Sequence, residues 1–410
     1  MAAWAQAVIA GAVKDSSGAV LPGVTVEAAS PALIEKVRTT VTDGNGLYRI
    51  EDLRPGSYTV TFTLPGFATL KREGIVLAGS FTAAIDADMK VGGLEETLTV
   101  TGEAPIVDVQ SAKRETTLNN DILKAIPTVR SYNALVVVVP GVVTNLNDTV
   151  VGTSTTQFPI HGGRNNEGRM TIDGLNIGNP PGGNQPPAYV ADVGNAEEVT
   201  FSTSGGLGES ETGGLTMNIV PKTGGNRIAG SLFFSGTNKS LQAKTVAYPG
   251  FVPVPYDKIY DLNGAAGGPI KKDRLHFFGH FDYEREPKTS VWNTPYPVFN
   301  VELHGPETVK MGGGRLDYQI SSKMRIMGKV TDAEHWQPFT PGNNSHPAAT
   351  GSTLETNREF TSQFTQVLSN RAVNEVKAGK TRWIFENANV TQWSKHWQAA
   401  NGVTTGDRKS

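Results

Sequence analysis

The sequence predicts a mostly β protein built from several successive regions. Gly and Pro number 46 and 24 among 410 residues, a composition that favours many short strands joined by turns. Alternation of polar and apolar residues at period two recurs along the chain. No apolar run reaches the 18 residues that a membrane-spanning helix needs, because ALVVVVPGVV at 134–143 is short and interrupted by Pro140. A transmembrane helix is therefore excluded, and a transmembrane barrel of strands is not.

Residues 8–90 are predicted to form a small β-sandwich. Alternating runs such as YTVTF at 58–62 are separated by TDGNG, RPGS and LPGF, which are turn sequences. Asp43 and Asn45 could suggest a calcium-binding loop, but they are not part of a 12-residue loop with a closing Glu. We therefore expect a hairpin turn there. Before this region, residues 1–7 hold an A-x-A-like triplet, AQA at 5–7, and we interpret them as the remnant of a signal peptide.

This first region resembles the carboxypeptidase regulatory-like domain, an Ig-like or transthyretin-like sandwich. The matching segments are DSSGAVLPGVTV, TDGNGLYRI and LRPGSYTVTFTLPGF. The resemblance implies an accessory module without peptidase activity. The residues agree, since neither H-E-x-x-H nor H-x-x-E occurs in the region.

Residues 91–102 are predicted to be a linker that contains an extended, unpaired strand. Within EETLTVT, Leu98 and Val100 alternate with threonines, and a strand of this kind can add to the edge of another sheet. The strand comprises Glu96, Thr97, Leu98, Thr99, Val100 and Thr101.

A short helix is predicted after this linker, in TTLNNDILKAIP. Asn119 or Asn120 is the candidate N-cap, and Pro127 ends the helix. Its apolar face is expected to comprise Ile122, Leu123 and Ile126.

The segment FPIHGGRNNEGRMTIDGLNIGNPPGG, residues 158–183, surrounds charged residues, among them Arg164, Arg169 and Asp173, with Gly and Asn. It contains neither G-x-G-x-x-G nor G-x-x-x-x-G-K-[ST], so a phosphate site is not indicated. RMTIDGLNI instead predicts a short strand that turns at Asp173-Gly174.

Residues 95–225 resemble the plug domain of a TonB-dependent outer-membrane receptor of the Oar-like branch. The motifs EETLTVTGEAP, IPTVRSYNALVVVVPGV, IHGGRNNEGRMTIDGLNI, AEEVTFSTSG and GGLTMNIVPKTGGN occur in the family's order. The resemblance implies an α+β plug at 103–225 that folds inside a barrel lumen. His161-Gly162 departs from the Arg-Gly that siderophore-receptor plugs commonly show, so siderophore specificity does not carry over.

Inside a lumen, enclosed charges need partners and turns lie close to the wall. We therefore expect Arg164, Arg169 and Asp173 to pair with one another or with wall residues, and Gly174 to permit close backbone approach. The predicted role of these four residues is docking of the plug.

Residues 226–410 are predicted to form the first part of a transmembrane antiparallel β-barrel. In RLHFFGHFDYERE at 274–286, apolar residues alternate with polar ones as they do in strands that face lipid and lumen. RLDYQI at 315–320 and KMRIMGKVT at 323–331 repeat the pattern, with a tight turn expected at the SS between them. The region accommodates about nine strands at roughly 20 residues each, fewer than the ~22 of a plugged barrel, so we expect an incomplete barrel.

Enzymatic, metal-dependent and nucleic-acid functions are not indicated. The net charge is -2, which gives no electrostatic attraction to nucleic acid, and Cys is absent. His276 and His280 lie about 13 Å apart along a strand, too far to share a metal ion. No nucleophile, base and orienting group cluster in the sequence. We predict no catalytic residue, no metal site and no cofactor.

The resemblance implies an energy-coupled import receptor in the outer membrane of a Gram-negative bacterium. Its sandwich and the strand Glu96–Thr101 would lie in the periplasm, where the strand would be offered to TonB. The expected partners are TonB, outer-membrane lipid and an extracellular ligand that is a carbohydrate, a peptide or a metal chelate. The alternative function is surface adhesion or anchoring without transport, for which a coupling strand has no use.

Overall fold

The computed structural model describes residues 7–77, 82–92, 97–101, 114–126, 132–136, 138–142, 160, 163, 167–176, 193–204, 214–241, 258–292, 300–338, 351–369 and 372–389. Strands dominate these segments and assemble into four sheets, which confirms the mostly β prediction. The signal-peptide interpretation falls on residues outside them, apart from Ala7, which begins the first strand.

The N-terminal sandwich consists of two sheets. One has the order β4-β1-β7, with β8 also paired to β1, and the other has the order β3-β2-β5-β6-β9. Their apolar core is supplied by alternate residues, such as Tyr58, Val60 and Phe62, which are almost fully buried. The strands are β1 (Ala7–Asp15), β2 (Thr25–Ala29), β3 (Val37–Val41), β4 (Leu47–Leu53), β5 (Gly56–Thr63), β6 (Thr69–Leu77), β7 (Thr82–Ala84), β8 (Ala87–Met89) and β9 (Thr97–Thr101).

The segment between β3 and β4 is a turn, but the expected hairpin is wrong, because β3 pairs with β2 and β4 pairs with β1 of the other sheet. The Asp43 carboxylate accepts hydrogen bonds from the backbone N–H groups of Asn45 and Leu47, at 2.9 and 3.0 Å. These bonds close the turn locally, in the way that Asp commonly does.

The expectation of an unpaired strand in the linker is wrong. β9 pairs in parallel with β6, in a register that aligns Thr97 with Thr69 and Thr101 with Glu73. The edge of β6 offers unpaired backbone groups, and the alternating linker sequence satisfies them. The sandwich sheet therefore extends beyond residue 90.

The second part of the chain is a five-stranded sheet with the order β10-β13-β14-β11-β12, which we call the plug. Its core contains Phe201, Leu215 and Met217, all completely buried. The elements are β10 (Arg114–Asn119), α1 (Asn120–Ala125), α2 (Tyr132–Val136), β11 (Arg169–Ile172), β12 (Leu175–Asn176), the 3-10 helix η1 (Val193–Asn195), β13 (Ala196–Ser204) and β14 (Thr216–Pro221). None of the helices in the described segments has the length and apolarity to cross a bilayer.

Helix α1 has the predicted N-cap, since Asn119 Oδ1 accepts a hydrogen bond from the Ile122 N–H at 3.0 Å. Leu123 and Ile126 pack against the plug core, as expected. Ile122 does not, because its side chain is 41% exposed. A helix of only six residues contacts the core along a narrow stripe, which leaves Ile122 outside it.

The third part is a seven-stranded antiparallel sheet in which each strand pairs with the next along the chain, and we call it the wall. Among the described residues, β15 and β21 each pair with a single strand, so the sheet is open. The strands are β15 (Ala229–Asn238), β16 (Lys258–Lys271), β17 (Leu275–Trp292), β18 (Val301–Ser321), β19 (Met324–Gln337), β20 (Gly351–Ser369) and β21 (Ala372–Asn389). The β18–β19 turn is Ser322-Lys323, one residue later than expected, because Ser321 still pairs with Met324.

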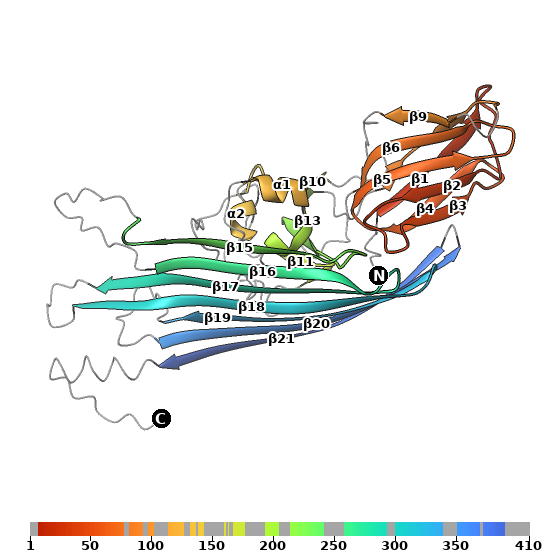
Figure 1. The fold of residues 1–410 in the computed structure, drawn as a ribbon. Coiled ribbons are helices and arrows are strands. Elements are labelled where there is room, and N and C mark those ends of the chain that lie inside the picture. Colours follow the sequence, from red (N-terminus) through yellow and green to blue (C-terminus); the bar gives the residue numbers. More distant parts are fainter. Residues whose placement is uncertain are drawn as a thin grey trace.

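The two faces of the wall differ in polarity, as the alternation predicted. Phe281, Leu316 and Val330 lie 47%, 51% and 49% exposed on one face. Asp282 and Asp317, on the opposite face, are buried. Figure 1 shows the plug elements against one face of the wall, and Met311 and Ala333 of the wall belong to the plug core. The buried polar face is therefore the one that meets the plug.

Candidate functional site: the plug–wall junction

The junction is built around a hairpin turn between β11 and β12. Asp173 and Gly174 both have positive φ, 51° and 76°, the backbone conformation of a tight two-residue hairpin turn. Asn218 of β14 supports the turn, because its Oδ1 accepts hydrogen bonds from the Gly174 N–H at 3.0 Å and from the Thr171 hydroxyl at 2.8 Å. The Asp173 side chain is thereby held at the end of the plug sheet.

Asp173 contacts three strands of the wall. Its carboxylate lies 3.1 Å from Lys329 Nζ of β19 and 3.8 Å from Arg315 Nη1 of β18. Its backbone carbonyl accepts a hydrogen bond of 3.3 Å from Lys377 of β21. The three ion-pairing side chains are only 7–12% exposed, so water screens their charges weakly.

The plug and the wall also approach each other closely beside this turn. A Cβ atom on Gly379 of β21 would lie 3.1 Å from Leu175 Cδ1 of the plug, tighter than ordinary packing. Because glycine has no Cβ atom, the wall backbone can approach the Leu175 side chain closely at this position.

Both cations that contact Asp173 have further ionic partners. Lys329 also lies 3.4 Å from Glu359 of β20. Arg315 donates to Asp317 through Nε and Nη2, at 2.8 and 3.0 Å, and Asp317 lies 3.1 Å from Arg54 Nη2 of the sandwich. Positive and negative groups thus alternate from the wall, through the plug turn, to the sandwich, and each buried charge has an opposite neighbour.

Arg54 connects the sandwich to both other parts of the chain. It lies between β4 and β5, where Tyr58 donates a hydrogen bond to its carbonyl at 2.7 Å. Besides the Asp317 contact, its Nη1 donates to the Thr223 hydroxyl at 2.8 Å. Burial raises the pKa of Glu197 in β13 above its ordinary value, and the positive charges of Lys222 and Arg54 oppose that rise.

A second group of hydrogen bonds connects the sandwich to the turn between β16 and β17. Asn226 donates through Nδ2 to the Ile34 carbonyl of the sandwich at 3.1 Å and to Asp273 at 2.8 Å. Its Oδ1 accepts from the Asp273 N–H and lies 2.8 Å from His276 Nε2. His276 is fully buried and acts here as a partner of Asn226.

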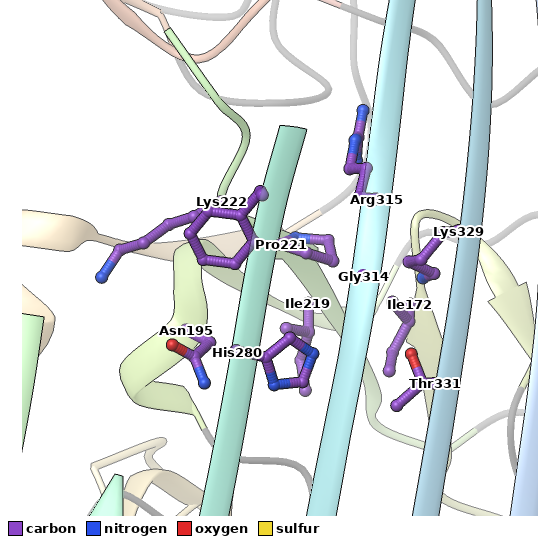
Figure 2. A pocket seen from close by; sticks show the side chains of 11 residues that line it. Ile172, Asn195, Ile219, Pro221, Lys222, His280, Gly314, Arg315, Lys329 and Thr331 are labelled. Carbon is purple, nitrogen blue, oxygen red and sulfur yellow. The ribbon is translucent and has the colours of Figure 1, made fainter. Parts of the chain in front are cut away.

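A cavity of about 40 Å³ lies in the seam between plug and wall. Ile172 and Ile219 of the plug line it together with His280, Arg315 and Lys329 of the wall, and Figure 2 shows Ile219 beside His280. This volume has room for a few water molecules and is far below the roughly 300 Å³ of small-molecule sites. The cavity belongs to the docking interface.

The predicted site residues fall in different places. Asp173 and Gly174 form the turn described above. Arg169 begins β11, where its guanidinium donates to the Gly168 carbonyl at 3.0 Å. Arg164 and Glu96 lie outside the described residues, and Thr97–Thr101 is β9 on the sandwich.

Several residues of the junction escaped the sequence analysis. Arg315 and Lys329 were recognised only as members of a polar strand face, and Arg54 only as part of the RPGS corner. Asp261, Asp282 and Glu284 form another buried group on β16 and β17, whose carboxylate oxygens lie within 4.8 Å of one another. The alternation of each strand places these residues on one face, but the register that brings them together comes only with the structure.

Comparisons with known proteins extend these observations. Residues 8–90 match the model of the carboxypeptidase regulatory-like domain. Over 361 residues the chain is 30% identical to the TonB-dependent transporter Oar of Myxococcus xanthus, a match that covers 80% of this chain and 32% of Oar. The chain therefore spans about a third of the length of that relative.

Two solved structures also resemble the fold. The outer membrane transporter YddB of Escherichia coli matches with a TM-score of 0.48 and 11% identity, over 65% of this chain and 38% of YddB. A mutant of the ferric enterobactin receptor PfeA of Pseudomonas aeruginosa matches with a TM-score of 0.46 and 11% identity, over 66% of this chain and 41% of PfeA.

Proposed function

We propose, from the relationship of this chain to the Oar-like TonB-dependent receptors with an N-terminal carboxypeptidase regulatory-like domain, that it serves TonB-dependent import across the outer membrane. The chain is an outer-membrane protein whose sandwich lies in the periplasm. In this proposal the wall is part of a transmembrane β-barrel, and the plug closes the lumen of that barrel. Energy delivered through TonB moves the plug.

The observation that carries the proposal is the docking of the plug through Asp173. A plug that must move needs contacts that hold it in a single resting position and can be broken without unfolding the chain. Ion pairs from one turn to Lys329 and Arg315, beside a small cavity, meet both needs. When the turn leaves, Lys329 keeps Glu359 and Arg315 keeps Asp317 as partners.

We further propose that Glu96–Thr101 is the strand that TonB contacts. The backbone of Thr97–Thr101 pairs with a sheet edge in the sandwich, which supports the view that this strand can pair with an edge of another protein. The ligand class is open among carbohydrates, peptides and metal chelates. The named relative is a transporter, which supports a role without catalysis.

Uptake by cells that carry the full-length gene tests the function. Labelled oligosaccharides, peptides and ferric chelates are offered to these cells, to cells with tonB deleted, and to cells with the Leu98→Pro variant. Deletion of tonB removes the partner, and Pro at position 98 cannot donate a strand hydrogen bond to it. We therefore expect both changes to abolish accumulation of the imported probe while its surface binding persists. Attachment to the surface without TonB-dependent accumulation of any probe would instead establish the adhesion function.

A further inference from the structure

The strand assigned to TonB already has a binding partner within the chain. All five residues of β9 align with β6, from Thr97 with Thr69 to Thr101 with Glu73. Residues 91 and 92, which precede β9 along the chain, are also attached, since Val91 bridges to Phe67 and the Gly92 N–H donates to the Gly66 carbonyl at 3.2 Å. β9 is the last strand of its sheet, so β6 occupies one of its two edges.

The sandwich that holds β9 is itself attached to the wall. Arg54 pairs with Asp317 of β18 at 3.1 Å, and Asn226, which also contacts the β16–β17 turn, donates to the Ile34 carbonyl at 3.1 Å. Figure 1 shows the sandwich beyond one end of the wall strands, with β9 on its far side. A force applied to β9 while it is still paired with β6 would therefore act first on the contacts between sandwich and wall, and only afterwards on the plug.

Exchange of β9 between two sheet edges conserves its main interactions. Backbone hydrogen bonds lost to β6 are replaced by equivalent bonds to an incoming strand, and a parallel ladder is slightly less stable per residue than an antiparallel one. A five-residue parallel pair is therefore suited to release.

We propose that the sandwich is a latch on the coupling strand, and that β6 and a strand of TonB compete for Thr97–Thr101. TonB binds the strand only after it leaves β6, and the pull then passes through the following chain to β10 of the plug. This inference rests on the proposed function, because it assumes that TonB is the partner.

A disulfide that fixes β9 on β6 tests the latch. The protein has no cysteine, so Lys71→Cys with Thr99→Cys, which are aligned in the parallel pair, introduces a single reactive pair. The matched control is Glu27→Cys with Thr39→Cys, two exposed residues aligned across β2 and β3 of the same sheet. Binding of the purified periplasmic domain of TonB to the full-length receptor in detergent is measured for oxidised and reduced forms.

We expect the oxidised Lys71→Cys/Thr99→Cys receptor to bind TonB at least tenfold more weakly than its reduced form, with full recovery on reduction. The control pair should bind equally in both forms. Equal TonB binding by the locked receptor would overturn the latch and show that TonB joins the other edge of β9. Failure of the disulfide to form would overturn it as well. Absence of TonB binding by the wild-type receptor would refute the proposed function itself, a result distinct from the other two.

Discussion

Asp173 is the residue on which plug docking depends, because its carboxylate faces two buried cations of the wall. Asp173→Asn keeps the size of the side chain and removes its charge. Loss of one partner from a buried ion pair costs about 3 to 5 kcal/mol, and here the cost is reduced because Lys329 and Arg315 keep other partners. We expect the plug to be destabilised by about 1 to 3 kcal/mol, measured by urea unfolding of a fluorophore-labelled plug in the full-length protein.

The control for this prediction is Asp121→Asn, which removes an exposed carboxylate from helix α1 of the same domain. An exposed carboxylate in the first turn of a helix contributes about 0.3 to 1 kcal/mol, so we expect this variant to shift stability by less than about 1 kcal/mol. Equal shifts for the two variants would mean that the Asp173 ion pairs do not hold the plug.

At the scale of single elements, we expect the apolar face of the wall strands to contact lipid. Phe281 lies on the outward face of β17 and is 47% exposed. A lysine on the lipid face costs about 2 to 4 kcal/mol near the bilayer midplane, so Phe281→Lys should lower the folded fraction in the outer membrane. The control is Ser322→Lys in the β18–β19 turn, which should assemble normally. The folded fraction of both variants is measured by their heat-modifiable mobility in gels. Normal assembly of Phe281→Lys would show that Phe281 does not face lipid.

Elements whose signals are local could be predicted from the sequence. The alternation in residues 274–286 identified β17 and its two faces, and Asp173-Gly174 identified a hairpin turn, because both depend on neighbours along the chain. The helix cap at Asn119 is equally local. Ile122 was misplaced because the width of a helix's buried stripe depends on what it packs against.

Contacts between distant segments could not be predicted. The pairing of β9 with β6 depends on an available edge in a folded sandwich. Arg54 and Asp317 lie 263 residues apart in sequence, and no motif marks either of them. The sequence thus showed which polar residues face inward, while their partners emerged only from the packing of plug, wall and sandwich.

At the scale of the whole molecule, Arg54 is predicted to hold the sandwich on the wall. Spin labels attached through Glu27→Cys on the sandwich and Ser322→Cys in the wall turn report the distance between the two parts. Arg54→Gln removes the charge that pairs with Asp317, so we expect the distance distribution to broaden. Arg49→Gln, which alters a pair with Glu51 that lies within the sandwich, should leave the distribution narrow. An unchanged width for Arg54→Gln would contradict the prediction.

The central claim is that TonB, acting through Thr97–Thr101, moves the plug away from the wall. Gly379→Cys introduces a single thiol on the wall, directly against Leu175 of the docked plug. Its labelling by a maleimide is measured in cells that produce the full-length protein, with Ser322→Cys as an accessible reference. The account predicts that labelling at 379 rises when TonB is present, and falls to the background level when tonB is deleted or Leu98→Pro is added. Labelling at 379 that is the same with and without TonB would contradict it.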